Sequence, residues 1–98
     1  MSLPLAFRAA ARAEFQDAAA WYESQRVGLG GDFVDEVQKV LDTVAGQPDR
    51  YPIASGDVRE APVSRFPYCV YYRVKPGRVV VIAVFHTARD PAAWQSRS

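Results

Sequence analysis

Residues 66–86 read FPYCVYYRVKPGRVVVIAVFH, and this stretch decides the fold. Phe66–Val74 is rich in aromatic and β-branched side chains, which favour strands. Lys75–Arg78 reads KPGR, which is a turn sequence. Val79–Phe85 is apolar at every position, so we expect a central strand that is covered on both faces. The stretch therefore predicts a β-hairpin whose second strand lies inside a sheet.

The residues before this hairpin predict two helices. Apolar side chains step by four and three positions through Ala9–Gln25 and again through residues 33–44, which is the spacing of a helix with one buried face. Three glycines between residues 28 and 31 predict a tight reversal after the first helix, and the sequence GQP at 46–48 ends the second. Two helices with so short a link form an antiparallel hairpin.

Further strands are expected on both sides of the helices. The alternating residues around Pro4 predict an edge strand, because proline cannot donate to a neighbouring strand. Residues 47–57 have loop composition, with Tyr51 and Ile53 expected to pin the loop to the core, and Val58–Val63 reads as a weak strand. The order is therefore β-α-α-β-β-β followed by a C-terminal tail. A chain of 98 residues has room for one domain, residues 1–98.

Composition excludes several classes of protein. The 49% of hydrophobic and 23% of charged residues fit a folded domain, and no stretch approaches the roughly 20 apolar residues of a membrane span. Cys69 and His86 are the single cysteine and histidine, which leaves neither an intrachain disulfide nor a structural zinc site. We expect a cytoplasmic protein with no metal, no cofactor and no membrane contact, in which Cys69 is a small buried hydrophobe.

Charge is distributed unevenly along the chain. Residues 1–56 carry five basic and eight acidic groups, whereas residues 57–98 carry seven basic and three acidic groups. Ten of the twelve cations are arginine, whose guanidinium pairs well with carboxylates and phosphates. The basic C-terminal half predicts an anionic partner, although a GC-rich genome that favours arginine codons gives the same composition.

Four segments, taken in order, carry more information than any single motif. They are AAAWYE (18–23), GLGGDFVDEV (28–37), RFPYCVYYRV (65–74) and FHTARDPAAW (85–94). This ordered set resembles the RelE/ParE superfamily of small toxins from type II toxin-antitoxin modules. The resemblance implies a compact α+β fold, in which an N-terminal helical hairpin packs on a small, mainly antiparallel sheet.

The resemblance also implies a function. The HxxRDPxxW ending is more similar to the ParE branch and its plasmid-stabilisation relatives, which implies a toxin that inhibits growth by poisoning DNA gyrase and is neutralised by a cognate antitoxin. One alternative is a RelE-like endonuclease that cuts mRNA at the ribosome, and another is a non-toxic relative that only binds an antitoxin. Two lysines and a net charge of +1 give little electrostatic help at the ribosome. Sequence-specific DNA binding by the toxin alone is not expected.

The nuclease alternative has candidate residues. Cleavage through the ribose 2′-OH needs an acid, a base, a cation at the phosphate and an aromatic surface for a base. The candidates for these roles are Arg65, Tyr72, His86 and Arg89. They contain no clear acid–base pair, and an imidazole at the end of a core strand also has a structural interpretation. We therefore expect binding rather than catalysis.

Arginine and tryptophan are the types most often found at interface hot spots. The expected target-binding residues lie in the tail and are Arg89, Trp94 and Arg97. The expected antitoxin-binding residues are Trp21, Arg59, Arg65 and Arg73. Each tryptophan also has a structural alternative, because Trp94 can cover the edge of the core after Pro91 opens a last helical turn, and Trp21 can lie in the core.

Overall fold

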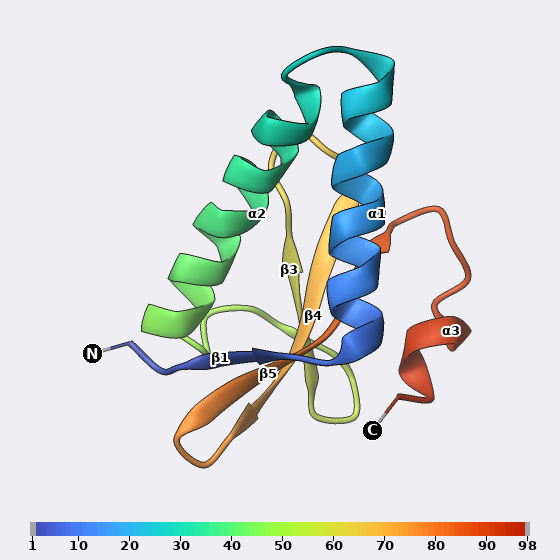
Figure 1. Cartoon of the computed structure of the whole chain (residues 1–98). Coiled ribbons are helices and arrows are strands. Elements are labelled where there is room, and N and C mark those ends of the chain that lie inside the picture. The colour runs from blue at the N-terminus through green and yellow to red at the C-terminus, as the bar shows by residue number, and fades with distance from the viewer. Residues whose placement is uncertain (1, 98) are drawn as a thin grey trace.

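The hairpin predicted from residues 66–86 is present and supplies the two longest strands among the described residues. The structure, a computed structural model, describes residues 2–97. β4 (Tyr68–Lys75) and β5 (Arg78–His86) pair antiparallel over their full lengths (Figure 1). Gly77 in the turn has a φ of 73°, a left-handed conformation that suits glycine.

The hairpin lies inside a five-stranded sheet with the order β1-β5-β4-β3-β2. β1 (Leu5–Phe7) is the expected edge strand and runs parallel to β5, whereas β3 (Val58–Pro62) pairs antiparallel with β4. β5 is therefore an interior strand, as its apolar sequence predicts, although β4 holds the middle position. The fold is the expected α+β class with a mainly antiparallel sheet.

β2 (Ile53–Ser55) corrects the expectation that residues 47–57 form only a loop. Its residues pair antiparallel with Val58 and Arg59 in β3, with an irregular register. Ile53 is 51% exposed and does not pin the segment to the core, whereas the half-buried Tyr51 does. An edge strand of three residues is too short to leave a period-two pattern in the sequence.

Two helices cover one face of the sheet (Figure 1). α1 (Ala9–Gln25) has the predicted bounds, and α2 (Leu29–Gly46) ends where predicted. The helices are antiparallel neighbours, as expected for so short a connection. Within residues 2–97, no helix has the length of apolar sequence that a membrane crossing needs.

The start of α2 differs from the prediction. Gly30 and Gly31 belong to its first turn rather than to the reversal, and Gly28 precedes the helix with a left-handed φ of 90°. A Cβ at position 30 would lie 2.5 Å from the carbonyl oxygen of Ala19, so Gly30 allows the two helices to approach closely. Gly30 therefore serves the close packing of the two helices rather than the predicted reversal between them.

The core has one part on each face of the sheet. The part under the helices contains large buried side chains from α2 and the sheet, among them Phe33, Val37, Val44, Val70, Tyr72, Val79 and Val81. The opposite face carries a smaller cluster, here called the tail-side cluster, which consists of Val58, Cys69, Tyr71, Ala83, Phe85 and Trp94. The last of these belongs to α3 (Ala92–Gln95), the helical turn in the tail. β5 contributes to both parts, which explains its unbroken apolar sequence.

Candidate functional site

Tyr72, a candidate for a nuclease site, is a core residue. Its side chain is fully buried beneath the helices, and its hydroxyl donates a hydrogen bond to the carbonyl oxygen of Pro48 at 2.7 Å. Burial raises the pKa of Tyr72 above its usual value, so the hydroxyl keeps its proton. Tyr72 therefore holds the loop that follows α2 and offers no surface on which a nucleotide base could stack.

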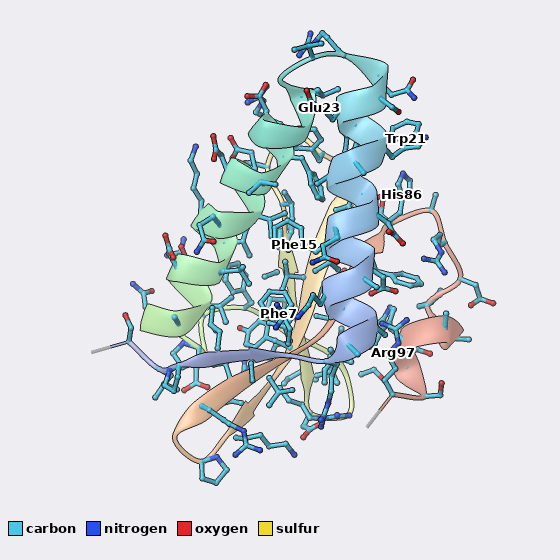
Figure 2. The ribbon with its side chains drawn as sticks, in the orientation of Figure 1. Phe7, Phe15, Trp21, Glu23, His86 and Arg97 are labelled. Atoms are coloured by element: carbon cyan, nitrogen blue, oxygen red, sulfur yellow. The ribbon has the colours of Figure 1, made fainter. Side chains whose placement is uncertain are left out.

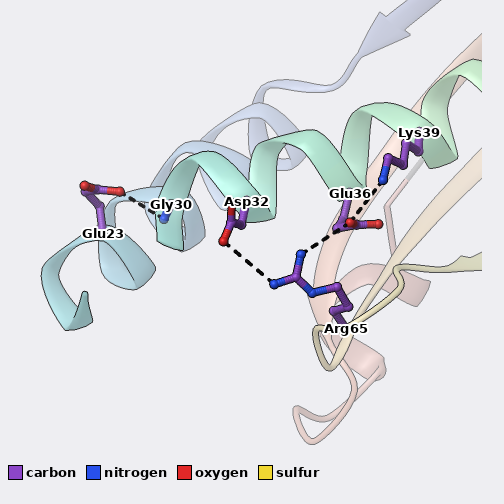
Figure 3. Close-up of polar contacts among 6 residues, drawn as sticks. All are labelled: Glu23, Gly30, Asp32, Glu36, Lys39 and Arg65. Atoms are coloured by element: carbon purple, nitrogen blue, oxygen red, sulfur yellow. Dashed lines mark hydrogen bonds and ion pairs between the residues drawn. The ribbon is translucent and has the colours of Figure 1, made fainter. Parts of the chain in front are cut away.

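Arg65 lies before β4, and its guanidinium faces α2 (Figure 3). Its terminal nitrogens lie 3.7 Å from the Asp32 carboxylate and 3.6 Å from the Glu36 carboxylate. Lys39 also contacts Glu36, at 3.2 Å. The φ of Arg65 is 71°, which is uncommon for a residue with a side chain and indicates local backbone strain. Two carboxylates already compensate the Arg65 charge, so this residue is poorly placed to bind a phosphate.

His86 ends β5 and is half-buried. Its ring meets the Tyr68 ring edge to face, with centroids 5.2 Å apart. Its Nδ1 accepts a hydrogen bond from the backbone N–H of Ala88 at 3.0 Å. One ring nitrogen therefore has a structural partner, as expected if the imidazole shapes the start of the tail.

Arg89 and Trp21 lie beside His86. The exposed Arg89 guanidinium lies 4.2 Å from the centroid of the Phe85 ring, and the Trp21 side chain on α1 is 57% exposed. Figure 2 shows Trp21 and His86 on the same side of α1. These side chains line a hollow of about 280 Å³, here called the α1 groove, together with the other lining residues Glu14, Asp17, Ala18, Tyr68 and Val84. The structure thus brings together two nuclease candidates and one antitoxin candidate.

The other tail residues face inward rather than toward a target. Trp94 is 2% exposed, and its ring stacks on Tyr71 with centroids 4.0 Å apart. Arg97 donates to both carboxylate oxygens of Glu14, at 2.9 and 2.8 Å, and to the carbonyl oxygen of Ile82 at 3.1 Å. The Glu14 hydrogen bonds raise the pKa of Arg97. This corrects the placement of Trp94 and Arg97 on a contact surface, because both side chains are used to hold the tail to the domain.

The expected antitoxin-binding residues do not form one surface. Arg59 donates to the carbonyl oxygen of Tyr51 at 2.7 Å and pairs with Asp49 at 3.5 Å. Arg73 pairs with Asp57 at 2.7 Å, and this hydrogen bond lowers the pKa of the Asp57 carboxyl. These two arginines stabilise different loops, and Arg65 is held against α2. Of the expected set, Trp21 remains the exposed group in the α1 groove.

Glu14 was not predicted as a site residue, although the sequence contains a signal for it. It lies between the buried Ala11 and Ala18 on the inner side of α1, and its side chain is only 15% exposed. An acidic residue within the apolar stripe of a helix predicts a buried partner. Its partner, Arg97, is 83 residues away in the sequence, so spacing does not identify it. In the part of the chain that is described, no three His, Cys, Asp or Glu side chains gather to hold a metal ion.

Residues 2–97 thus form a small α+β fold, in which a helical hairpin covers one face of a five-stranded sheet and the tail covers the other. A family model described as "ParE toxin of type II toxin-antitoxin system, parDE" matches residues 5–91. The chain belongs to this ParE toxin family of type II toxin-antitoxin systems.

A solved structure agrees with this fold. A chain from "Chromosomal ParDE TA system from P. aeruginosa" superposes with a TM-score of 0.73 at 16% sequence identity. The alignment covers 87% of this chain and 96% of that chain. No curated protein matches the sequence significantly.

Proposed function

We propose that this chain is a growth-inhibiting toxin that acts by binding DNA gyrase, and that a cognate antitoxin neutralises it. Membership of the ParE toxin family, whose model matches residues 5–91, supports the choice of gyrase as the proposed target. A plasmid-stabilisation or other maintenance role belongs to the same proposal. The toxin is then a binding protein without a catalytic step of its own.

We prefer binding over catalysis because the four candidate nuclease residues do not lie together in one site. Tyr72 is in the core, and Arg65 is paired with Asp32 and Glu36 on α2. Only His86 and Arg89 remain in the α1 groove. RNA cleavage by a 2′-OH gains from an acid, a base and stabilising cations acting together, and this arrangement supplies one imidazole and one guanidinium.

A ribosome-dependent mRNA endonuclease is the second candidate function. One observation favours it, because His86, Arg89 and the exposed Trp21 share the α1 groove. An imidazole, a cation and an aromatic ring are groups that such a nuclease uses. The two candidate functions differ in whether activity depends on the His86 imidazole.

Growth inhibition by substituted chains separates the two candidates. Catalysis by His86 contributes about 10²–10⁴ in rate, so His86→Gln would disable a nuclease and spare a binding toxin. We expect induced His86→Gln to inhibit growth almost as the parent does, and Arg89→Gln to inhibit it much less. Arg78→Gln, at the far end of β5, changes the net charge equally and serves as the control.

Point substitutions are preferable to removal of the tail from Arg89 onward. Such a truncation also removes Trp94 and Arg97, and so uncovers the tail-side cluster and the Glu14 carboxylate. Circular dichroism of each variant establishes that it is folded. Loss of growth inhibition in folded His86→Gln, together with ribosome-dependent mRNA cuts by the parent, would establish the nuclease instead. A folded parent that does not inhibit growth would contradict both candidates.

A further inference from the structure

The α1 groove contains both a poorly exposed carboxylate and a guanidinium that has no ion pair. Glu14 and Arg89 line the same hollow of about 280 Å³, Glu14 from α1 and Arg89 from the tail. Within residues 2–97, an ion pair is found for Glu14 but none for Arg89. Opposite charges in one hollow attract each other, so another group must prevent Arg89 from pairing with Glu14.

Arg97 is the group that occupies Glu14. Its two terminal nitrogens donate to the two carboxylate oxygens of Glu14, at 2.9 and 2.8 Å. The backbone N–H of Val84 donates to one of the same oxygens at 3.2 Å. Both oxygens are thus engaged, and the charge of Glu14 is compensated by a guanidinium whose planar fork matches the carboxylate.

Arg97 and Arg89 lie close to each other, although they come from different parts of the tail. Their guanidinium carbons lie 5.9 and 4.2 Å from the centroid of the same ring, that of Phe85. Arg97 is mostly covered and is bonded to Glu14, whereas Arg89 is exposed. Two neighbouring guanidiniums therefore have access to one carboxylate, and Arg97 holds it.

The charges of Glu14 and Arg89 also act on a common neighbour in the groove. Burial raises the pKa of Tyr68 above its usual value, and of the two groove charges Arg89 lowers this pKa whereas Glu14 raises it. The carboxylate and the free guanidinium thus lie near the same phenol. A change in the rotamer of Arg89, rather than a rearrangement of the fold, separates the free state from a pair with Glu14.

Asp17 is the other carboxylate of the α1 groove, and it attracts Arg89 less than an uncompensated Glu14 would. Asp17 is exposed, whereas the Glu14 side chain is only 15% exposed. An ion pair in contact with water contributes little, while a poorly exposed charge that loses its partner is costly. Without Arg97, Glu14 is therefore the group with which Arg89 pairs.

We propose that Arg97 is a positioning residue for target binding, because its pair with Glu14 keeps the Arg89 guanidinium free for the target. Arg97 itself does not contact the target. When Arg97 is absent, Arg89 pairs with Glu14 inside the α1 groove and is withdrawn from the surface. The role of Arg89 as a target contact rests on the proposed function, whereas the competition of two arginines for one carboxylate does not.

The expected loss of binding follows from the fraction of molecules in which Arg89 is free. The apparent affinity of a protein falls in proportion to the population that is competent to bind. If the new pair with Glu14 holds Arg89 in about four-fifths of the molecules, target binding weakens about fivefold. We therefore expect Arg97→Gln to inhibit gyrase about fivefold more weakly than the parent, although Arg89 is still present.

A double variant separates this role from a purely structural one. Glu14→Gln combined with Arg97→Gln removes the competing carboxylate together with its partner, so Arg89 is free again. We expect gyrase inhibition by the double variant to return to within about twofold of the parent. If Arg97 acted only by holding the tail, the double variant would stay as impaired as Arg97→Gln, because both lack the charged hydrogen bonds. Arg78→Gln is the charge-matched control.

NMR of the ¹⁵N-labelled full chain measures the pairing of Arg89 without any target. The readout is the rate at which the Arg89 Nε proton exchanges with solvent. We expect this rate to be at least about threefold lower in Arg97→Gln than in the parent, and to recover in the double variant. Circular dichroism establishes that each variant is folded.

Arg97→Lys is a second variant that keeps a positive charge beside Glu14. Its Arg89 exchange rate and its inhibition of gyrase should both stay within about twofold of the parent. This variant keeps the test decisive if Arg97→Gln does not fold. A folded Arg97→Lys that inhibits gyrase as weakly as Arg89→Gln, with Arg89 exchange as in the parent, overturns the inference.

The outcomes separate this inference from the proposed function. Unchanged Arg89 exchange in folded Arg97→Gln overturns the competition for Glu14, whatever the gyrase assay gives. Equal impairment of Arg97→Gln and the double variant overturns it as well. Slower Arg89 exchange in Arg97→Gln, in a chain whose parent leaves gyrase unimpaired, supports the competition and contradicts the proposed target.

Discussion

Cys69 belongs to the tail-side cluster, and its surroundings determine its chemistry. Burial raises the pKa of the Cys69 thiol to about 11, and the neighbouring Glu60 adds to the effect. The thiol therefore stays protonated at neutral pH, and the thiolate is the nucleophile. We expect native protein at pH 8 not to react with a disulfide reagent, and unfolded protein to react at once. Rapid labelling of the native thiol would show that the tail does not cover this face.

The same shift has a consequence for stability. Because the folded state holds the thiol proton more tightly than the unfolded state, whose thiol titrates near its ordinary value of about 8.5, the stabilisation is complete below that value. It is lost as the pH rises toward about 11. Denaturant unfolding at several pH values should therefore show a smaller decrease between pH 9 and 11 for Cys69→Ala than for the parent. An equal decrease in the free energy of unfolding for Cys69→Ala and the parent would contradict the raised pKa of Cys69.

Arg97 holds the tail through its two hydrogen bonds to Glu14 and one to Ile82. Removing one member of a poorly exposed charge pair leaves the other without its partner, so Arg97→Ala should lower the free energy of unfolding by about 1–3 kcal/mol. Arg97→Lys should recover only part of this loss, because lysine lacks the planar, two-pronged guanidinium. Urea unfolding measures all three proteins. If Arg97→Ala were as stable as the exposed-site control Arg78→Ala, the tail would have no such anchor.

The helical hairpin offers a test with two adjacent glycines. A Cβ at Gly30 would lie 2.5 Å from the carbonyl oxygen of Ala19 and 2.9 Å from atoms of Glu23, whereas a Cβ at Gly31 meets nothing within 4 Å. Gly30→Ala should therefore cost about 1–3 kcal/mol through steric overlap. Gly31→Ala should stabilise the protein by about 0.5–1 kcal/mol, because alanine is the better helix former. Thermal and urea unfolding measure the stability of both variants. Changes of the same sign in the free energy of unfolding would contradict this packing of α1 on α2.

Glu23 shows why the beginning of α2 could not be predicted. Its carboxylate accepts hydrogen bonds from the backbone N–H groups of Gly28 and Gly30, at 2.9 and 3.0 Å (Figure 3 draws the second). A helix start is usually recognised by a capping side chain immediately before it, but here the acceptor comes from the end of α1. Periodicity predicted the bounds of α1 and the β4–β5 hairpin because those elements carry long patterns. β2 was missed because three residues carry none.

The candidate site was predictable residue by residue and not as an assembly. Trp21, His86 and Arg89 could be named from their types, but their meeting depends on the tail passing beside α1, which no sequence spacing records. Trp94 and Arg97 have the residue types of interface hot spots, yet a small domain uses both to cover the second face of its sheet. A chain of this size buries a smaller fraction of its surface than a large domain does, so it uses large and charged side chains such as these to stabilise the fold.

Among residues 2–97, four arginines (Arg59, Arg65, Arg73 and Arg97) have carboxylate partners, whereas the α1 groove presents Arg89 with no ion pair, which supports a toxin that acts by contact. Gyrase is the target that we propose for this member of the ParE toxin family. A toxin that acts by contact should be impaired by Arg89→Gln and spared by His86→Gln. A nuclease should be disabled by His86→Gln. The matched pair changes one side chain at a time and tests two of the residues that line the α1 groove.

The most direct test is DNA supercoiling by purified gyrase in the presence of the purified, folded toxin. We predict inhibition of supercoiling by the parent and by His86→Gln at similar concentrations, and at least about tenfold weaker inhibition by Arg89→Gln, as expected for the loss of one hot-spot contact. Arg78→Gln should inhibit as the parent does. Unimpaired gyrase at every toxin concentration, combined with mRNA cleavage on ribosomes that His86→Gln no longer supports, would contradict the account.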